Sequence, residues 1–271
     1  MRIALAQCNS GTDPDANLAL LTELTGEAAR QGAELVVFGE AMMCRFGVPL
    51  GPVAEPLDGP WARGVDAVAQ QTGVAVIAGM FTPSDDGRVH NTLVIAVPGR
   101  PLASYDKIHL YDAFGFAESR TVAPGSEPTV VEIAGHRVGV ATCYDIRFPA
   151  LFTELARRGA ELIAVPASWG SGPGKVAQWQ LLASARALDS ATFLVAVDQA
   201  LPDGADLGAH SAPTGVGHSR ISDPFGSVIA EYGPGRHLGV HDLDLSAVGH
   251  ARAASAVLEN QREIPRSGPN L

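Results

Sequence analysis

One cysteine of this sequence, Cys143, stands at the end of an apolar segment, at the point where a helix is predicted to begin. Residues 138–142 form the apolar segment, and residues 144–149 lead into the helix. Ligands of α/β proteins bind at the carboxyl ends of strands, and a thiol on such a turn meets backbone N–H groups that lower its pKa and can hold an oxyanion. The position favours a nucleophile for acyl transfer. The alternative is an inert buried thiol, which is common for a single cysteine beside a strand.

A glutamate occupies the same kind of position on another predicted strand. Glu40 follows residues 35–39, so its carboxyl group should lie at the carboxyl end of a central, buried strand. Burial disfavours the charged form and raises the pKa of a carboxyl group, which suits a general base or acid working near neutral pH. The alternative is a carboxylate that extends past the strand end into solvent.

A lysine with apolar and aromatic neighbours is the third candidate. Lys107 lies in the segment 105–112, next to the strand region 102–105. Lysine is seldom buried without a partner, so its side chain either reaches solvent or pairs with a carboxylate such as that of Glu40 or Glu118. A paired ammonium near a thiol would stabilise negative charge on a carbonyl oxygen, whereas an ammonium in solvent would have no such role.

Other patterns predict no chemistry of their own. Cys8 also ends a predicted strand, but residues 9–11 follow it with no aspartate or arginine nearby, so we interpret it as structural. The segment 169–176 fails the phosphate-loop pattern at its first and last positions, and we expect a mobile loop beside the site. His237 and His241 flank a predicted strand without a third ligand in register, so no metal site is predicted.

Composition and charge exclude several classes of protein. The chain has 271 residues, 46% of them hydrophobic and 18% charged, and its net charge is −10. An acidic chain of this kind is a poor partner for nucleic acid, and no apolar stretch approaches the roughly 20 residues that cross a bilayer. Three cysteines without a Cys-x-x-Cys pair argue against disulfides and zinc. The first residues resemble a strand rather than a signal peptide, so we expect a soluble, cytoplasmic protein.

Strands and helices are predicted to alternate, which indicates an α/β fold. The apolar and β-branched runs predict strands at 2–7, 35–38, 74–80, 91–97, 129–133, 137–142, 162–166, 192–198, 219–222, 227–231 and 238–243. The clearest helices are expected at 14–31, 60–72, 149–158 and 175–190, and three of them open with proline.

Two pairs of segments in the sequence resemble each other. Residues 2–8 resemble residues 137–143, and residues 32–38 resemble residues 159–165. Each half then has a strand, a helix and a strand, and two such halves would build a four-layer α-β-β-α sandwich with pseudo-twofold symmetry. Chance similarity is the alternative, because apolar strands draw on few residue types. No linker separates the halves, so we expect one domain over residues 1–271.

Taken together and in this order, these residues resemble the nitrilase, or carbon–nitrogen hydrolase, superfamily. The segments that carry the resemblance are 35–40, 105–112, 116–119, 139–149, 167–169, 186–187, 217–219 and 223–226. The resemblance implies an α-β-β-α sandwich and a catalytic triad of Glu40, Lys107 and Cys143. It also implies that Glu118 is a second, positioning glutamate. Small-molecule amidases, including omega-amidases and deaminated-glutathione amidases, are the most similar branch, although Gly39 stands where many relatives have proline.

The resemblance further implies acyl transfer without a cofactor. Glu40 would take the proton of Cys143, and the thiolate would attack an amide carbon. Lys107 and the backbone N–H of Tyr144 would hold the oxyanion. Glu40 would then protonate the departing ammonia and activate the water that cleaves the thioester.

Two residues near Cys143 are candidates for substrate recognition. Arg147, together with Trp169 on its loop, is expected to recognise a substrate carboxylate, since a guanidinium group matches that geometry. An ion pair between Arg147 and an acid such as Asp145 is the alternative. We therefore expect an amidohydrolase for a small carboxylate-bearing amide. A nitrilase or an N-carbamoyl hydrolase would use the same triad, and a catalytically silent binding protein is the alternative outside enzymes. By analogy with relatives, we expect a homodimer or a larger homo-oligomer.

Overall fold

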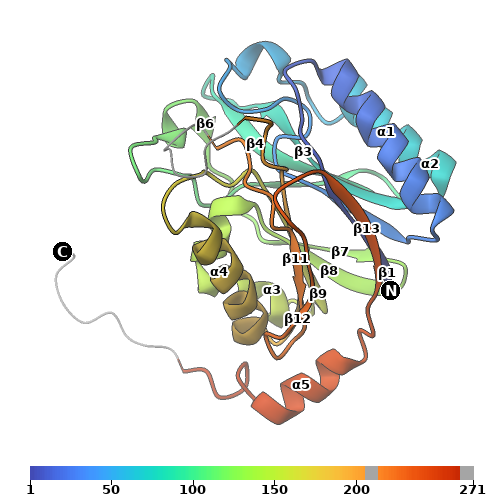
Figure 1. Cartoon of the computed structure of the whole chain (residues 1–271), viewed down its shortest axis with the longest axis vertical. Helices are drawn as coiled ribbons and strands as arrows, with labels where there is room; N and C mark the ends of the chain where they lie inside the picture. The colour runs from blue at the N-terminus through green and yellow to red at the C-terminus, as the bar shows by residue number, and fades with distance from the viewer. Residues whose placement is uncertain (205–212, 263–271) are drawn as a thin grey trace.

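The computed structural model describes residues 1–204 and 213–262, and these residues form two β-sheets (Figure 1). The first sheet contains β1 (Arg2–Gln7), β2 (Leu35–Phe38), β3 (Ala75–Pro83), β4 (Val89–Ala96), β5 (Ala103–Asp106), β6 (Val122–Ala123) and β13 (His237–Asp242). The second contains β7 (Thr129–Ile133), β8 (His136–Val140), β9 (Leu162–Ala167), β10 (Phe193–Asp198), β11 (Arg220–Ser222) and β12 (Val228–Glu231). The strand orders are β13-β1-β2-β3-β4-β5, with β6 beside β4, and β12-β11-β10-β9-β8-β7.

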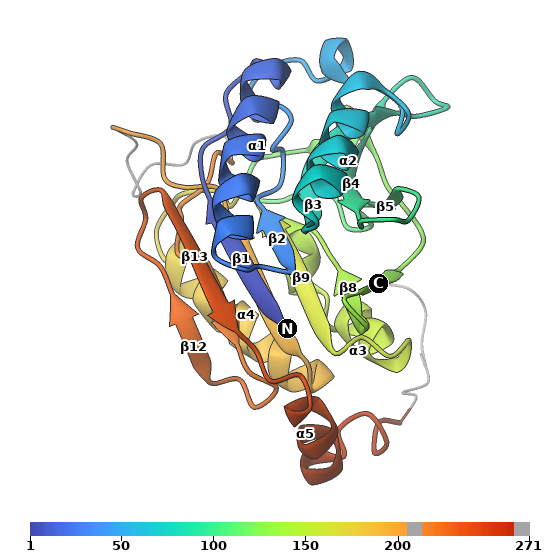
Figure 2. The same ribbon diagram turned by 90° about the vertical axis from the view of Figure 1, so that its right-hand side faces the viewer.

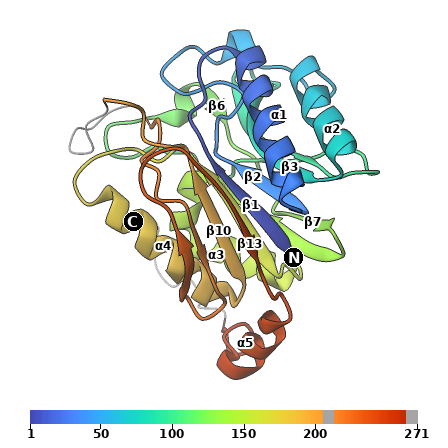
Figure 3. The ribbon, with the colours of Figure 1, turned by 45° about the vertical axis from the view of Figure 1, so that its right-hand side comes forward.

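Helices cover the outer faces of both sheets. The α-helices are α1 (Pro14–Arg30), α2 (Pro60–Thr72), α3 (Pro149–Arg157), α4 (Lys175–Ser190) and α5 (Ala247–Ser255). Short 3₁₀ helices are η1 (Gly51–Val53), η2 (Glu118–Arg120) and η3 (Cys143–Arg147). Figures 1 and 3 show α1 and α2 on one side of the paired sheets and α3 and α4 on the other. The arrangement is the four-layer α-β-β-α sandwich that the sequence predicts.

Strand β2 shows how the layers are held together. Its residues are fully buried, and they alternate between two apolar clusters, as side chains of a strand must. Leu35 and Val37 face the other sheet, whereas Val36 and Phe38 pack with the residues of α1 and α2. Figure 2 shows β2 running beside β9 of the second sheet. The sheet-to-sheet core thus lies directly beneath the loops that leave these strands.

The two halves share one topology, which confirms the duplication predicted from the internal sequence similarity. In the first half, β1, α1, β2, α2 and β3 form consecutive parallel units, and β4 returns antiparallel. In the second half, β8, α3, β9, α4 and β10 do the same, and β11 returns antiparallel. Parallel strands place their carboxyl ends at the same edge, so loops of both halves meet there.

Most elements have bounds within one residue of the expected ones, and β3, β4 and β8 differ by two or three residues at one end. Helices α2 and α4 and strands β1 and β2 match exactly the predicted ranges, and α1 and α3 each end one residue earlier. Among the strands and α-helices of the described residues, two were not predicted. Strand β6 has two residues, too few for a pattern, and α5 buries only Val248 and Ala251, so its apolar face is too narrow to stand out. No helix in the described ranges is long and apolar enough to cross a membrane.

Candidate active site

Cys143 lies on a strained turn between β8 and α3. It is the first residue of η3, and its φ angle is 45°, a conformation that non-glycine residues seldom adopt. The backbone N–H of Thr142 donates to Asp145 Oδ2 at 2.8 Å and so fixes the turn from the preceding residue. Because such strain persists only where the surroundings impose it, the turn holds the thiol in one place at the end of the sheet.

Asp145 joins this turn to the segment that carries Lys107. Its carboxylate accepts hydrogen bonds from the hydroxyl of Tyr105 at 2.7 Å and from the backbone N–H of His109 at 2.9 Å. These two donors flank Lys107 in the sequence. Since the same carboxylate also accepts the bond from Thr142, it ties two distant segments together. Asp145 is fully buried and is a structural link between the two loops.

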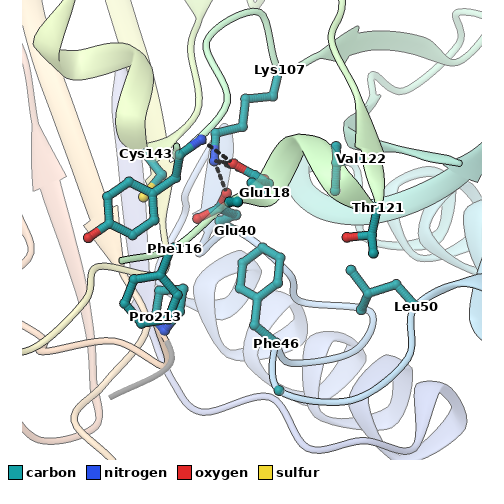
Figure 4. Close-up of a pocket in the computed structure, with 13 residues that line it drawn as sticks. Glu40, Phe46, Leu50, Lys107, Phe116, Glu118, Thr121, Val122, Cys143 and Pro213 are labelled. Atoms are coloured by element: carbon teal, nitrogen blue, oxygen red, sulfur yellow. Dashed lines mark hydrogen bonds and ion pairs between the residues drawn. The ribbon is translucent and has the colours of Figure 1, made fainter. Parts of the chain in front are cut away.

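The Lys107 ammonium lies between two carboxylates. Lys107 Nζ is 2.9 Å from Glu40 Oε1 and 2.9 Å from Glu118 Oε2, as Figure 4 shows. Lys107 and Glu40 are 2% and 1% exposed. The Asn91 amide donates to Glu40 at 2.7 Å and to Glu118 at 3.0 Å. The paired alternative for Lys107 is therefore confirmed, and the alternative of a solvent-exposed Glu40 is wrong.

The second oxygen of Glu40 leads to the thiol through Ser168. Glu40 Oε2 accepts a hydrogen bond from the Ser168 backbone N–H at 2.9 Å. The Cys143 thiol donates to the Ser168 carbonyl oxygen, with 3.8 Å between sulfur and oxygen. The backbone of Glu40 is also held, because its N–H donates to Ala167 O and its carbonyl accepts from the Gln199 amide. The loops after β2, β8, β9 and β10 thus converge on one point.

This arrangement gives a steric reason for a glycine at position 39. A Cβ on residue 39 would lie 3.0 Å from the carbonyl oxygen of Ala167 and 3.1 Å from the backbone nitrogen of Gln199. Contacts this short force neighbouring backbone to move. The glycine therefore allows the loops after β9 and β10 to approach Glu40 closely.

Burial dominates the protonation behaviour of these groups. It raises the pKa of Glu40 above 4.5, and the Glu118 carboxylate adds to this effect while Lys107 opposes it. Burial, and then the Glu40 carboxylate, raise the pKa of the Cys143 thiol well above its ordinary value. Burial alone would lower the pKa of Lys107, but the carboxylates of Glu118 and Glu40 outweigh it and raise that pKa well above the usual value. The thiol at rest is therefore neutral, beside a charged lysine.

A cavity opens over these groups. Its volume is about 260 Å³, and Glu40, Lys107, Glu118 and Cys143 line its polar end. The rest of the wall is largely apolar and is formed by Phe46, Gly47, Leu50, Tyr111, Phe116, Ala117, Thr121, Val122 and Pro213. A cavity of this size and lining suits a small molecule with one polar, reactive end.

A smaller space on the other side of the thiol holds the three remaining sequence candidates. Tyr144, Arg147 and Trp169 line it together with Cys143. Arg147 donates to the Gln178 side chain at 2.8 Å, and its guanidinium carbon lies 5.1 Å from the centre of the Trp169 ring. No ion pair joins Arg147 to Asp145 in the described parts of the chain, so that alternative is wrong.

Sequence reasoning missed four residues that contact this site. Asn91, Ser168 and Gln199 act through contacts with partners far away in the sequence. Ser168 lies in the segment 167–169 that carries the resemblance, but nothing in the sequence assigns a role to any of the three. Lys175 lines the smaller space beside Arg147. A signal for it existed, because this chain contains only two lysines.

The residues set aside by sequence reasoning lie apart from this chemistry. Cys8 is buried, its sulfur is 3.7 Å from that of Met42, and burial raises its pKa to about 12. His241 accepts or donates a hydrogen bond with the Tyr232 hydroxyl at 2.9 Å. Within residues 1–204 and 213–262, no group of three His, Cys, Asp or Glu side chains is placed to hold a metal ion.

The sequence as a whole matches a family model described as carbon-nitrogen hydrolase over residues 2–253. The chain belongs to the carbon–nitrogen hydrolase family. This carbon–nitrogen hydrolase is 61% identical over 270 residues to Hydrolase Rv0480c of Mycobacterium tuberculosis, with 97% of the chain and 96% of the relative covered. It is 34% identical over 253 residues to the deaminated glutathione amidase of Escherichia coli O157:H7, with 92% of each covered. It is 31% identical over 268 residues to the human omega-amidase NIT2, with 96% and 95% covered.

Solved structures agree with this assignment. The CN-hydrolase superfamily protein XC1258 of Xanthomonas campestris, which carries an arsenic adduct in its active site, has a TM-score of 0.84, 27% identity and coverage of 98% and 99%. A Glu-to-Gln and Cys-to-Ala double mutant of the amidase from Nesterenkonia sp. AN1, in complex with acrylamide, has a TM-score of 0.81, 27% identity and coverage of 97% and 94%. The resemblance to the nitrilase superfamily and its fold is confirmed, and the carbon–nitrogen hydrolase is an enzyme of the amidase-containing family.

Proposed function

We propose that the protein hydrolyses the C–N bond of a small carboxylate-bearing amide and releases ammonia, with Cys143 as the nucleophile. The observation that carries this proposal is the shared cavity of Cys143, Glu40 and Lys107, in which a base, an ammonium and a thiol border the same space. Three such groups are what acyl transfer to sulfur needs. The acrylamide bound to the similar amidase supports an amide as the substrate.

Glu40 is the general base and acid. The thiol is neutral at rest, so its proton has to leave when sulfur attacks the carbonyl carbon. Glu40, whose pKa is raised but which contacts a charged lysine, accepts that proton. The C–S bond forms while the carbonyl π electrons move to oxygen, giving a tetrahedral oxyanion.

Lys107 and the Tyr144 backbone hold this oxyanion. The Lys107 ammonium contributes a full charge in a site from which water is largely excluded, where such a charge acts strongly. Tyr144 is the second residue of η3, so its N–H has no acceptor within that helix and is available to a ligand. Glu118 holds the ammonium from the other side and so positions it.

Collapse of the intermediate breaks the C–N bond. Glu40 returns its proton to the nitrogen, ammonia leaves, and an acyl thioester remains on Cys143. A water molecule then attacks the thioester carbon and gives its proton to Glu40. The second oxyanion collapses, the C–S bond breaks, and the thiolate recovers the proton from Glu40. The products are one carboxylic acid and one ammonia for each amide and water consumed.

Arg147 supplies the preference for a carboxylate. It lies beside Cys143 with Trp169 and Tyr144, and its guanidinium has a neutral amide, not an acid, as its hydrogen-bond partner. A planar guanidinium binds a carboxylate through paired hydrogen bonds. The substrate carboxylate would therefore lie on the Arg147 side of the thiol, with the amide group in the larger cavity.

Ammonia release tests the proposal. The purified protein is incubated with small amides that carry a carboxylate, with neutral amides of equal length, and with the corresponding nitriles and N-carbamoyl compounds. We expect ammonia from the carboxylate-bearing amides and none above background from the Cys143→Ala variant. Cys8→Ala, which removes a thiol outside the cavity, is the matched control and should retain turnover. Activity that survives in Cys143→Ala would contradict the proposal.

A further inference from the structure

Both lysines of this chain are buried, and only one of them has a carboxylate partner. Lys107 is 2% exposed and Lys175 is 4% exposed, although lysine is among the residues least often buried without a partner. Lys107 contacts two carboxylates. Among residues 1–204 and 213–262, no acid pairs with Lys175, whose ammonium has the Tyr111 hydroxyl as its hydrogen-bond partner at 3.2 Å.

Aromatic faces surround the Lys175 ammonium. Its nitrogen lies 3.6 Å from the centre of the Phe114 ring, 5.4 Å from that of Tyr111 and 5.7 Å from that of Trp169. The negative face of an aromatic ring attracts a cation, but it does not neutralise the charge. The site therefore holds a buried charge that is only partly compensated.

A second cation lies against the same rings. The Arg147 guanidinium carbon is 5.1 Å from the Trp169 ring centre and 5.6 Å from that of Phe114, and Arg147 Nε is buried without a hydrogen-bond partner. Burial, and then the charge of Arg147, lower the pKa of Lys175. A buried lysine and a half-buried arginine that repel each other are costly unless an anion joins them.

The position of the pair shows where such an anion would bind. Cys143 and Tyr111 line both the small space beside Arg147 and Lys175 and the larger cavity with Glu40 and Lys107. We propose that Lys175 and Arg147 together bind the carboxylate of the amide substrate, and that Lys175 is a specificity-determining residue. This inference rests on the proposed amidase function and adds to it a second cation that the sequence did not predict.

The side chain of Phe114 would have to move when a carboxylate binds between the two cations. The space between the cations measures about 10 Å³, too little for a carboxylate. Phe114 is the ring closest to Lys175, it is 52% exposed, and it lies in a loop with positive φ at both Phe114 and Gly115. Its movement into solvent would uncover the Lys175 ammonium and exchange a cation–π contact for stronger, charge-assisted hydrogen bonds.

Binding to a protein that cannot turn over tests the inference without relying on catalysis. In the Cys143→Ala variant, calorimetry compares succinamate and glutaramate with the neutral amide butyramide. We expect the carboxylate-bearing amides to bind at least about 10-fold more tightly than butyramide, because butyramide has no carboxylate to form charge-assisted hydrogen bonds with Lys175 and Arg147. Adding Lys175→Met should remove most of this preference, and Lys175→Arg should retain part of it.

The control removes a positive charge elsewhere. Arg63→Met, on the exposed side of α2, makes the same charge change in the same Cys143→Ala background and should preserve the preference. Equal binding of charged and neutral amides by the parent would overturn the inference. So would a preference that survives Lys175→Met, or a loss that Lys175→Met and Arg63→Met share.

A spectroscopic readout separates direct contact from a structural effect. Lysine labelled with ¹³C at Cε gives signals from only two side chains, Lys107 and Lys175. Succinamate should move the Lys175 signal and raise the pH at which it titrates, and butyramide should not. A Lys175 signal that ignores succinamate contradicts the inference.

Turnover distinguishes the two proposals. If the wild type hydrolyses amides but Lys175→Met changes KM for succinamate and butyramide by the same factor, the Lys175 assignment fails and the amidase function stands. If no amide is hydrolysed, the proposed function fails, and the binding measurements still decide the role of Lys175.

Discussion

The thiol of Cys143 faces the carbonyl oxygen of Ser168, at 3.8 Å, in the resting structure. The same residue donates its N–H to Glu40. Because burial and the Glu40 carboxylate raise the pKa of the thiol, the thiol is neutral and donates its proton to this carbonyl. In the proposed mechanism, that proton then moves to Glu40. Ser168 thus contacts both Cys143 and Glu40, the proposed nucleophile and base, through its backbone.

The pH profile should report the coupling of Glu40 to Glu118. Burial and then the Glu118 charge raise the pKa of Glu40, so Glu118→Gln should lower it and move the acid limb of kcat/KM to lower pH. The glutamine oxygen still accepts a bond from Lys107, which limits the structural change. Glu127→Gln, at an exposed position, should leave the limb in place. An acid limb that stays fixed or rises in Glu118→Gln would contradict the assignment of Glu40 as the base.

Removal of Lys107 should destabilise the fold in a pH-dependent manner. Lys107→Met leaves the buried carboxylates without a countercharge, and breaking a buried pair in this way costs about 3–5 kcal/mol. Lys107 lowers the pKa of Glu40, so its loss raises that pKa further above the unfolded value. A raised carboxyl pKa stabilises the fold at low pH, and this stability is lost as the pH rises through the folded pKa.

Urea unfolding of Lys107→Met at pH 5 and pH 8 checks this expectation. The decrease in the free energy of unfolding, relative to wild type, should be larger at pH 8 than at pH 5. Arg100→Met breaks an exposed pair with Glu132 and should have a small effect at both pH values. A loss that is equal at the two pH values would show that the carboxylates do not carry it.

The close packing beneath Glu40 makes Gly79 a sensitive position. A Cβ on residue 79 would clash with the backbone nitrogen of Ala41 and would lie 2.9 Å from the carbonyl carbon of Glu40. Gly79→Ala should therefore displace Glu40, the proposed base, and lower kcat by about 100-fold, the cost of a misplacement near 1 Å. Gly26→Ala, in open space on α1, should keep activity and stabilise the protein by about 0.5–1 kcal/mol. Wild-type kcat in Gly79→Ala would refute this placement.

Asp198 holds the loop after β9. Its carboxylate accepts hydrogen bonds from the backbone N–H groups of Trp169 at 2.7 Å and Val216 at 2.8 Å. In Asp198→Asn the amide NH₂ faces one of these N–H donors, which is then left without an acceptor. The free energy of unfolding should therefore fall by about 1–3 kcal/mol at pH 5. Burial raises the pKa of Asp198 from 3.8 to about 7. The wild type therefore loses stability as the pH rises from 3.8 to about 7, whereas the asparagine does not titrate. The difference in free energy of unfolding between wild type and variant should accordingly shrink by pH 8. A deficit that grows with pH, measured by urea unfolding, would contradict this sign.

Local sequence predicted the elements better than it predicted their contacts. Strand β2 and helix α4 have the expected bounds because apolar runs and proline or glycine boundaries are local signals. Cys143 and Glu40 could be placed at strand ends for the same reason. Their convergence came from the family resemblance, since no spacing along the chain fixes which loops meet across two sheets.

The residues that were missed depend on tertiary contacts. Asn91 lies in the middle of β4 and resembles any polar strand residue, yet it bridges Glu40 and Glu118. Ser168 contributes through its backbone, which carries no sequence signal. Lys175 belongs to the segment 169–176 that was expected beside the site, and it is one of only two lysines, but its significance depends on the aromatic rings that surround it.

Trapping of the acyl-enzyme tests the central claim most directly. The protein is mixed with a turned-over amide, quenched in acid within the first turnovers, digested and analysed by mass spectrometry. The account predicts an acyl group on the peptide that contains Cys143, removable by hydroxylamine, and unmodified peptides for Cys8 and Cys44. Rapid amide hydrolysis with no acyl group on Cys143 at any quench time, or an acyl group on another residue, would contradict it.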